Sequence, residues 1–234
     1  MKKFELTTEF ITNALGKKLF RIKALVEFGS VKAGELGGYA EKEENISQDG
    51  NAWVSGDAKV SGNAKVSGNA RVSGNAKVSG NAEVYGDTEV FGNAEVYGDA
   101  KVFGNAWVSD DACVYGDAKV FGNAWVSDDA KVSGNARVSG DARVYGDAWV
   151  SGNAKVFGNA DYALVQGFGT EFRCTTFYRG KNKKIMVNCG CFHGDLEEFR
   201  KQVKETRSGK IAKEYLMIAG LMEYHFASED SSNE

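Results

Sequence analysis

The stretch Val54-Ser-Gly-Asp-Ala-Lys-Val60-Ser-Gly-Asn-Ala-Lys-Val66 begins a six-residue phrase, V-[SYF]-G-[ND]-A-x, that continues almost without error to Ala160. Valine recurs at every sixth position as far as Val156, which makes 18 consecutive hexads with none out of register. Because side chains alternate along an extended chain, each valine points to the same side as the alanine two residues before it. Glycine and Asn or Asp tolerate a left-handed backbone. Each hexad therefore predicts a short strand followed by a corner.

Corners at every sixth residue wrap the chain into a coil, and stacked coils at the strand spacing of about 4.8 Å form a parallel β-helix. A helical period of 3.6 would scatter the valines around a cylinder, and a hairpin fold would need turns every ~8 to 12 residues. Three hexads per coil predict a triangular prism. The expected fold is mainly β, with about six triangular coils around a thin core of valine and alanine.

The hexad Val66-Ser67-Gly68-Asn69-Ala70-Arg71 has an aliphatic residue followed four positions later by a small one. This pattern is similar to the bacterial hexapeptide-transferase motif, and the resemblance implies a left-handed parallel β-helix and often a trimer. The flanks resemble prophage-type hexapeptide-repeat proteins of unassigned function, which implies a phage or mobile-element origin but names no activity. The segments that carry this second resemblance are Leu19–Ala24, Gly37–Tyr39, Thr176–Tyr178 and Cys189–Phe192.

The composition divides the chain into four parts. Residues 1–50 lack a clean register and are expected to cap the β-helix with an irregular first coil. The hexapeptide-repeat β-helix covers residues 51–160. Residues 161–226 predict a small α+β domain, in which two strands flank Arg179-Gly-Lys-Asn182 and Asp195 with Glu198 forms the capping box of a helix. Residues 227–234 predict an acidic, flexible tail.

Charge and cysteine content narrow the class of protein. The net charge of −3 and the pI near 5.6 argue against a general nucleic-acid binder. Four cysteines are too few and too clustered for a secreted disulfide framework. Glu5 and Glu9 interrupt any apolar signal region, and no run approaches the ~18 apolar residues of a membrane span. We therefore expect a cytoplasmic protein with no membrane partner.

Aromatic residues recur at the outward positions with the 18-residue spacing of one coil. Tyr85, Phe103 and Phe121 fall in one column, and Trp107 lies below Trp125 in another. One interpretation is a pair of ladders that stabilise neighbouring coils. The other is an interface, because exposed aromatic rows mark sites of protein contact. The partner would be another protein or a second copy of this chain, for example in a homotrimer.

Two hexads replace the corner glycine with aspartate, one full coil apart. They place Asp110, Asp111, Asp128 and Asp129 at two adjacent corners, with Asp147 one coil further on. Stacked carboxylates repel one another, and a hard cation such as calcium relieves that repulsion with oxygen ligands. The alternative is a hydrated acidic corner left by an 18-residue duplication.

A column of basic residues follows the same spacing, and its members are Lys101, Lys119, Arg137 and Lys155. Such a column could contact an acidic partner or a phosphate backbone. Aspartates at nearby corners dilute its field, so the alternative is a solvated face.

Four residues near the C-terminus have the donor atoms of a zinc site, namely Cys174, Cys189, Cys191 and His193. The Cys-Gly-Cys spacing is shorter than that of the usual zinc knuckle. A buried, reduced hairpin is therefore the alternative, and no cofactor is expected.

Hexapeptide acyltransferases generally use a histidine on or between their coils as general base. This chain has two histidines, His193 and His225, and both follow the repeats. The absence of histidine from the coils favours a non-enzymatic scaffold or protein-binding module. Two alternatives stay open: an acyltransferase-like enzyme with a site at a subunit interface, and an inhibitor of a host nucleic-acid-processing complex.

Overall fold

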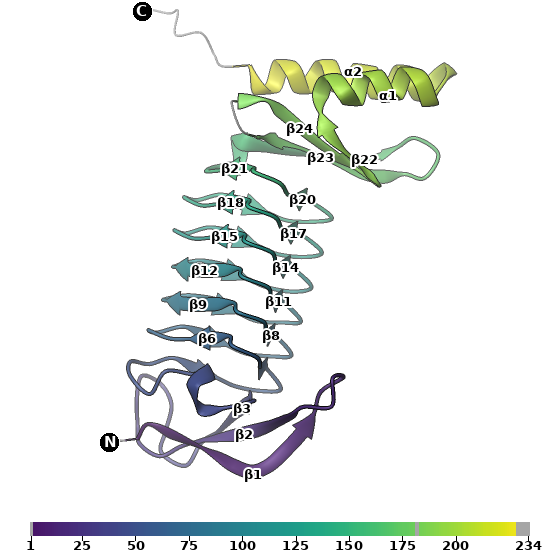
Figure 1. Cartoon of the computed structure of the whole chain (residues 1–234). Coiled ribbons are helices and arrows are strands. Elements are labelled where there is room, and N and C mark those ends of the chain that lie inside the picture. The colour runs from purple at the N-terminus through teal and green to yellow at the C-terminus, as the bar shows by residue number, and fades with distance from the viewer. Residues whose placement is uncertain (1, 181–182, 228–234) are drawn as a thin grey trace, which may run out of the picture.

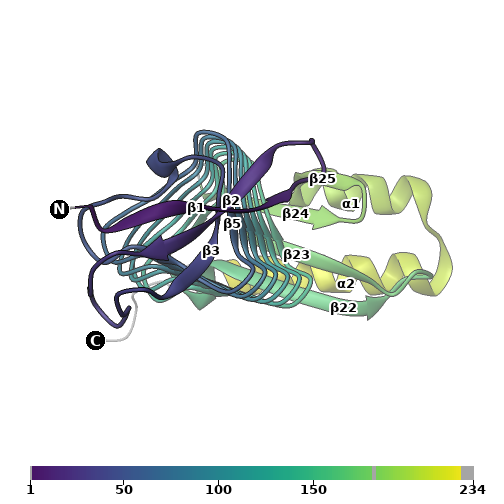
Figure 2. The same ribbon diagram turned by 90° about the horizontal axis from the view of Figure 1, so that it is seen from below.

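The repeats form a straight column of stacked coils with different caps at its two ends (Figure 1). The computed structural model describes residues 2–180 and 183–227. An antiparallel hairpin lies at the N-terminal end of the column, and a small sheet covered by two helices lies at the C-terminal end. Seen along the axis, the coils superpose almost exactly (Figure 2). The predicted parallel β-helix with a small C-terminal α+β region is therefore confirmed.

Eighteen short strands form three parallel sheets, named here after their first regular strands. The β4 sheet holds β4 (Trp53–Val54), β7 (Arg71–Val72), β10 (Glu89–Val90), β13 (Trp107–Val108), β16 (Trp125–Val126) and β19 (Arg143–Val144). The β5 sheet holds β5 (Lys59–Val60), β8 (Lys77–Val78), β11 (Glu95–Val96), β14 (Cys113–Val114), β17 (Lys131–Val132) and β20 (Trp149–Val150). The β6 sheet holds β6 (Lys65–Val66), β9 (Glu83–Gly86), β12 (Lys101–Gly104), β15 (Lys119–Val120), β18 (Arg137–Val138) and β21 (Lys155–Val156).

The inward positions form a continuous core, because valine pairs with valine in every coil. Val90 pairs with Val108, and both are fully buried, as is Ala106. At the corners the backbone is left-handed, and Gly98 has φ of 74°. A Cβ on Gly98 would lie 3.0 Å from the backbone nitrogen of Gly116 in the next coil. The glycine therefore serves both the positive φ and the close approach of successive corners.

At the corners and strand ends, backbone N–H groups donate to carbonyl groups of the following coil, while the parallel pairing of the strands also uses bonds in the opposite direction. Asn63 N donates to Gly80 O at 2.8 Å, and the same step of 17 residues recurs along the column. At the corners, free N–H groups consequently collect at the C-terminal end and free carbonyl groups at the N-terminal end. Since buried backbone groups need partners, the N-terminal cap must offer donors to these carbonyl groups, and the C-terminal cap must offer acceptors to these N–H groups.

The N-terminal cap extends the β5 sheet with β1 (Phe4–Thr12), β2 (Lys18–Ala24) and β3 (Leu36–Ala40). The strands β1 and β2 pair antiparallel, whereas β3 pairs parallel with β5. Ile46 forms a parallel bridge with Val66. These contacts make an irregular first turn below six regular ones, so the solenoid has about seven turns.

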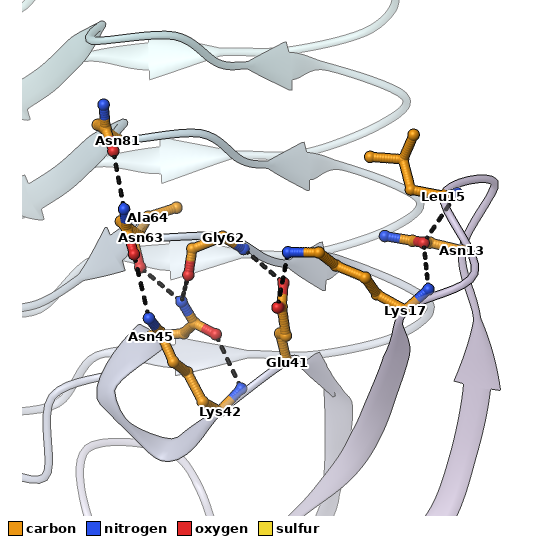
Figure 3. Close-up of polar contacts among 10 residues, drawn as sticks. All are labelled: Asn13, Leu15, Lys17, Glu41, Lys42, Asn45, Gly62, Asn63, Ala64 and Asn81. Atoms are coloured by element: carbon orange, nitrogen blue, oxygen red, sulfur yellow. Dashed lines mark hydrogen bonds and ion pairs between the residues drawn. The ribbon is translucent and has the colours of Figure 1, made fainter.

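Side-chain donors satisfy the carbonyl end of the column (Figure 3). Asn45 Nδ2 donates to Gly62 O at 3.1 Å and to Ala64 O at 2.8 Å. Lys3, which is 4% exposed, donates from Nζ to Ala52 O at 2.9 Å. The irregular sequence of the cap thus supplies the donors that a repeating hexad cannot.

The C-terminal region is an antiparallel sheet of β22 (Tyr162–Phe168), β23 (Arg173–Arg179), β24 (Ile185–Cys189) and β25 (Phe192–Asp195), with α1 (Leu196–Thr206) and α2 (Gly209–Phe226). Strands β23 and β24 form the predicted hairpin. The predicted capping box is also present, since Glu198 N donates to Asp195 Oδ1 at 3.0 Å and Asp195 N donates to Glu198 Oε2 at 2.8 Å.

The two faces of this sheet have different roles. Phe177 and Val187 pack against Phe199 on α1 and Tyr215 on α2. On the opposite face, Thr176 Oγ1 accepts a hydrogen bond of 3.0 Å from Trp149 N in the last coil. The sheet therefore offers the last coil an acceptor, Thr176 Oγ1, and a donor, Asn188 Nδ2, which bonds Trp149 O. The helices cover the outer face (Figure 1).

Part of the predicted acidic tail, residues 228–234 with Glu229 and Asp230, lies outside the described residues. Within the described ranges, neither helix is both long enough and apolar enough to span a bilayer. The handedness of the coil stays a prediction.

Candidate functional site

The first candidate is the outer surface of the β6 sheet, where the predicted aromatic column forms a stack. Tyr85 and Phe103 have ring centroids 5.0 Å apart and planes 3° apart. Phe103 and Phe121 follow at 4.9 Å and 2°. Strands β9 and β12 pair along four residues, which include Phe103 with Tyr85. The 18-residue spacing thus produces the expected ladder, although the partner-binding role of these residues stays a prediction.

The predicted basic column lies beside this ladder on the same sheet. Parallel pairing brings Lys101 next to Lys119, Lys119 next to Arg137, and Arg137 next to Lys155. Lys101 Nζ forms an ion pair of 2.9 Å with Glu83. The remaining three cations lie toward the C-terminal end. Together, Tyr85, Phe103, Phe121, Lys101, Lys119, Arg137 and Lys155 make a surface that we call the aromatic–basic face.

The two tryptophans belong to the β4 sheet, and their arrangement differs from the expected stack. Trp107 and Trp125 pair in register, but their rings meet edge to face at 5.4 Å and 65°. Trp125 Nε1 donates to Ser109 Oγ at 3.2 Å, and the guanidinium of Arg143 lies 5.7 Å from the Trp125 ring. These contacts turn the Trp125 ring away from its neighbour. Because Trp107 and Trp125 belong to the β4 sheet, they lie on a different face from the ladder of Tyr85, Phe103 and Phe121.

The sequence contains a second ladder that the interpretation above omitted. Tyr97 and Tyr115, on the β5 sheet, stack with centroids 5.0 Å apart and planes 3° apart. The signal was the same 18-residue spacing. Burial chiefly raises the pKa of the Tyr97 hydroxyl. All three sheets therefore carry aromatic contacts between coils, which shows that ring pairing also stabilises the column.

The acidic corners do not gather into a metal site. Asp110 and Asp128 adopt the expected left-handed backbone, with φ of 57° and 56°. Their carboxylates are taken by local donors, since Asp110 Oδ2 accepts from Ser109 Oγ at 2.8 Å and Asp128 Oδ2 accepts from Gly146 N at 2.9 Å. In residues 2–180 and 183–227, no group of three or more His, Cys, Asp or Glu is arranged to hold a metal ion. The prediction of calcium at Asp110, Asp111, Asp128 and Asp129 is therefore unsupported.

Asp111 instead ends a ladder of side-chain amides. Asn75 Nδ2 donates to Asn93 Oδ1 at 3.1 Å, and Asn93 Nδ2 donates to Asp111 Oδ1 at 3.0 Å. Asn63, Asn81 and Asp99 repeat this pattern at another corner. Figure 3 shows the bond from Asn63 to Asn81. An amide both donates and accepts, whereas a carboxylate only accepts. The Asn-Asn-Asp order therefore explains acidic residues at these corners without a metal.

The predicted zinc ligands are separated by the alternation of the sheet. Cys189 pairs with Thr175 and packs on the side of the sheet that the helices cover. Cys174 precedes Thr175 in β23, so its side chain lies on the other side and faces the β-helix. Burial, aided by Asp147, raises the pKa of the Cys174 thiol to about 11, so it is protonated at neutral pH. A bound zinc ion would itself lower this pKa, so the separation of the side chains, and not the protonation of Cys174, argues against the site. The prediction of zinc at Cys174, Cys189, Cys191 and His193 therefore finds no support in the geometry.

His193 reaches the last coil of its own chain. The ring nitrogen Nδ1 lies 2.6 Å from Asn188 Oδ1, and Nε2 lies 3.6 Å from the position that a Cβ on Gly152 would occupy. Asn188 Nδ2 donates to Trp149 O at 2.6 Å and to Ser151 Oγ at 3.1 Å. His193 therefore contacts a corner of its own chain.

Three segments of the column match the family model described as YdcK Beta solenoid repeat. They are residues 64–78, 130–146 and 136–152. The chain is similar to that repeat over these segments, which supports a β-solenoid repeat fold and names no activity. A comparison with curated proteins finds no match.

Proposed function

We propose that the protein is a non-enzymatic scaffold that binds protein chains through the aromatic–basic face. The observation that carries this proposal is the ladder of Tyr85, Phe103 and Phe121 beside the cations Lys119 and Arg137. Partly exposed aromatic rings with an arginine nearby are typical of protein interfaces. The stacked rings present edges rather than free faces, so nucleobases could stack only at the two ends of the ladder. This geometry favours a protein partner over a nucleic acid.

The first partner that the charges fit is a second copy of the chain. Asp111 and Lys119 belong to one coil, and Asp129 and Arg137 belong to the next. If two chains lie side by side with parallel axes, the acidic corner of one chain can face the basic column of the other at the same height. Successive coils in both chains are about 4.8 Å apart, so the charges stay aligned along the axis. Such a contact is heterologous, and repeated around a three-fold axis it closes into a trimer. Self-association therefore uses both charged columns.

Three further assignments belong to the same proposal. The hexad pattern supports membership of the hexapeptide-repeat superfamily with a left-handed coil. The flanking segments support a phage or mobile-element origin, and the reduced cysteines support a cytoplasmic location. The absence of histidine from residues 51–160 weighs against an acyltransferase.

Sedimentation velocity with a charge-reversal series tests the proposal. We expect the wild type to form an oligomer that dissociates as salt rises, and Lys119→Glu with Arg137→Glu to give monomers. The matched control is Lys59→Glu with Lys65→Glu, which changes the same charge on the first regular coil. Mixing the Lys119→Glu/Arg137→Glu chain with an Asp111→Lys/Asp129→Lys chain should restore assembly. A wild type that stays monomeric under all conditions contradicts self-association.

A further inference from the structure

A groove lies where the C-terminal domain meets the last corner of the β-helix, and its volume of ≈ 330 Å³ is within the range of small-molecule sites. One wall is the corner Ser151–Asn153, and the other is built from β24, β25 and the beginning of α1. The lining residues are Ser151, Gly152, Asn153, Gly180, Lys184, Met186, His193, Asp195 and Glu198. This groove is at the C-terminal end of the column, and its lining includes none of the residues of the aromatic–basic face.

The hydrogen bonds around Asn188 determine which ring nitrogen of His193 carries a proton. Asn188 Nδ2 makes two donations, to Trp149 O and Ser151 Oγ, so the amide oxygen is the atom that faces His193. That oxygen can only accept. His193 Nδ1 must therefore donate across the 2.6 Å contact, which leaves Nε2 as the acceptor in the neutral ring.

This acceptor belongs to a groove whose charge balance is negative. Lys184 Nζ pairs with Asp195 Oδ2 at 2.7 Å, which neutralises both groups. The bond from Lys184, together with the backbone N–H of Glu198, holds the pKa of Asp195 below its usual range. Glu198 accepts from Asp195 N with one oxygen, Oε2. Among the lining residues, Lys184 is one cation against the two carboxylates of Asp195 and Glu198, so the charge of the lining is negative.

We infer that the groove is a binding site for a small cationic amine that donates a hydrogen bond to His193 Nε2. His193 Nε2 can accept a hydrogen bond from an ammonium N–H, and the Glu198 carboxylate of the same groove favours a positive charge. An anion is disfavoured, because Asp195 and Glu198 already occupy the N-terminus of α1, where an anion would bind. Met186 supplies an apolar surface for the carbon skeleton of the ligand.

Three two-carbon probes distinguish a cationic, a neutral and an anionic ligand: ethanolamine, ethylene glycol and glycolate. The readout is the pair of ring nitrogen signals in a long-range ¹⁵N–¹H NMR spectrum, which is simple because the chain has two histidines. In the free protein we expect His193 to show the Nδ1–H tautomer. Ethanolamine should then shift the His193 signals saturably, at concentrations at which glycolate and ethylene glycol do not.

Two variants locate the site. Glu198→Gln keeps a side-chain oxygen for the capping box but removes the charge, and should weaken ethanolamine binding by about fivefold or more. His225→Gln, at the C-terminal end of α2, should bind ethanolamine as the wild type does. This variant also identifies the His193 signals, because His193 is then the one histidine left in the chain. An Nε2–H tautomer, equal response to the three probes, a preference for glycolate or no saturable shift with ethanolamine would each overturn the inference. The tautomer is read on the wild type, so this part of the test does not depend on a variant folding.

Discussion

Lys3 donates from Nζ to the carbonyl oxygen of Ala52 at 2.9 Å, and so places an amine at the carbonyl end of the β-helix. The side chain also contacts Gly50 O at 3.3 Å, and the residue is 4% exposed. Desolvation lowers the pKa of Lys3 from 10.5 to about 8, and nearby Asp49 opposes this shift only in part. The neutral amine still has two hydrogens to donate. The cap therefore functions without the charge.

The depressed pKa of Lys3 predicts that the protein becomes more stable as pH rises above 8. Between pH 8 and 10.5 the unfolded chain holds a proton on Lys3 that the folded chain has released, so the free energy of unfolding increases with pH. The gain should be on the order of 2 kcal/mol by the upper end of the window. Urea titrations between pH 7 and pH 9.5 measure it as the difference between the wild type and Lys3→Met. The difference is needed because burial raises the pKa of the Cys174 and Cys113 thiols, which lowers the stability of both proteins as pH rises through this range.

Lys3→Met should lose this rise, whereas Lys2→Met should keep it. Lys2 is the matched control because it is half exposed and pairs with Glu43. A wild-type profile parallel to that of Lys3→Met would contradict the assigned pKa.

Stacking within the aromatic ladder predicts that Phe103→Ser destabilises the column. Phe103 stacks on both sides, with Tyr85 and with Phe121. Loss of two ring pairs should cost about 2 kcal/mol in the free energy of unfolding. Phe157→Ser is the matched control. Phe157 is in the same column, but it is 55% exposed and its neighbour one coil earlier is Ser139 instead of an aromatic residue. Equal losses for both variants in urea unfolding would argue against a structural contribution from stacking.

The amide ladder predicts a pH-dependent cost for Asn81→Asp. Asn81 accepts from Asn63 at 3.1 Å and donates to Asp99 at 3.0 Å, so the substitution sets two carboxylates against each other. At pH 7 we expect a loss of about 1 kcal/mol. Repulsion from Asp99 raises the pKa of the new carboxyl, so its protonation near pH 4 should recover most of the loss. Thermal unfolding at the two pH values checks this, with Asn153→Asp, on the last coil, as control.

The repeating part of the fold could be predicted from sequence because the residues of each hexad determine its own local structure. Val, Ala and Gly at fixed positions specify burial and left-handed corners without reference to distant residues, as Val90 and Gly98 illustrate. The caps could not be predicted in this way. The bond from Lys3 to Ala52 joins two residues that are 49 positions apart in the sequence. It occurs once, so no repeating pattern predicts it.

The candidate sites show the same limit. Spacing placed Trp107 and Trp125 in one column, but the bond from Trp125 to Ser109 determines the ring angle. The four zinc-ligand candidates could not be placed from spacing alone, because strand register, which pairs Thr175 with Cys189, decides which thiols share a face. The tautomer of His193 likewise depends on the two donations of Asn188, which connect β24 to a coil almost 40 residues earlier.

Asn188 predicts how the C-terminal domain detaches. Its amide, 3% exposed, bonds Trp149, Ser151 and His193 across the junction. Asn188→Ala leaves buried partners unsatisfied and should cost about 3 kcal/mol. Because the coils below keep their own hydrogen bonds, the loss should be local to the junction. Hydrogen exchange should therefore accelerate in β22–β25 while β5–β14 keep their protection. Asn153→Ala is the control, because Asn153 is an exposed residue of the same corner as Ser151, and it should leave exchange in both regions unchanged. If Asn188→Ala instead accelerated exchange uniformly along the whole column, the chain would unfold as a single unit.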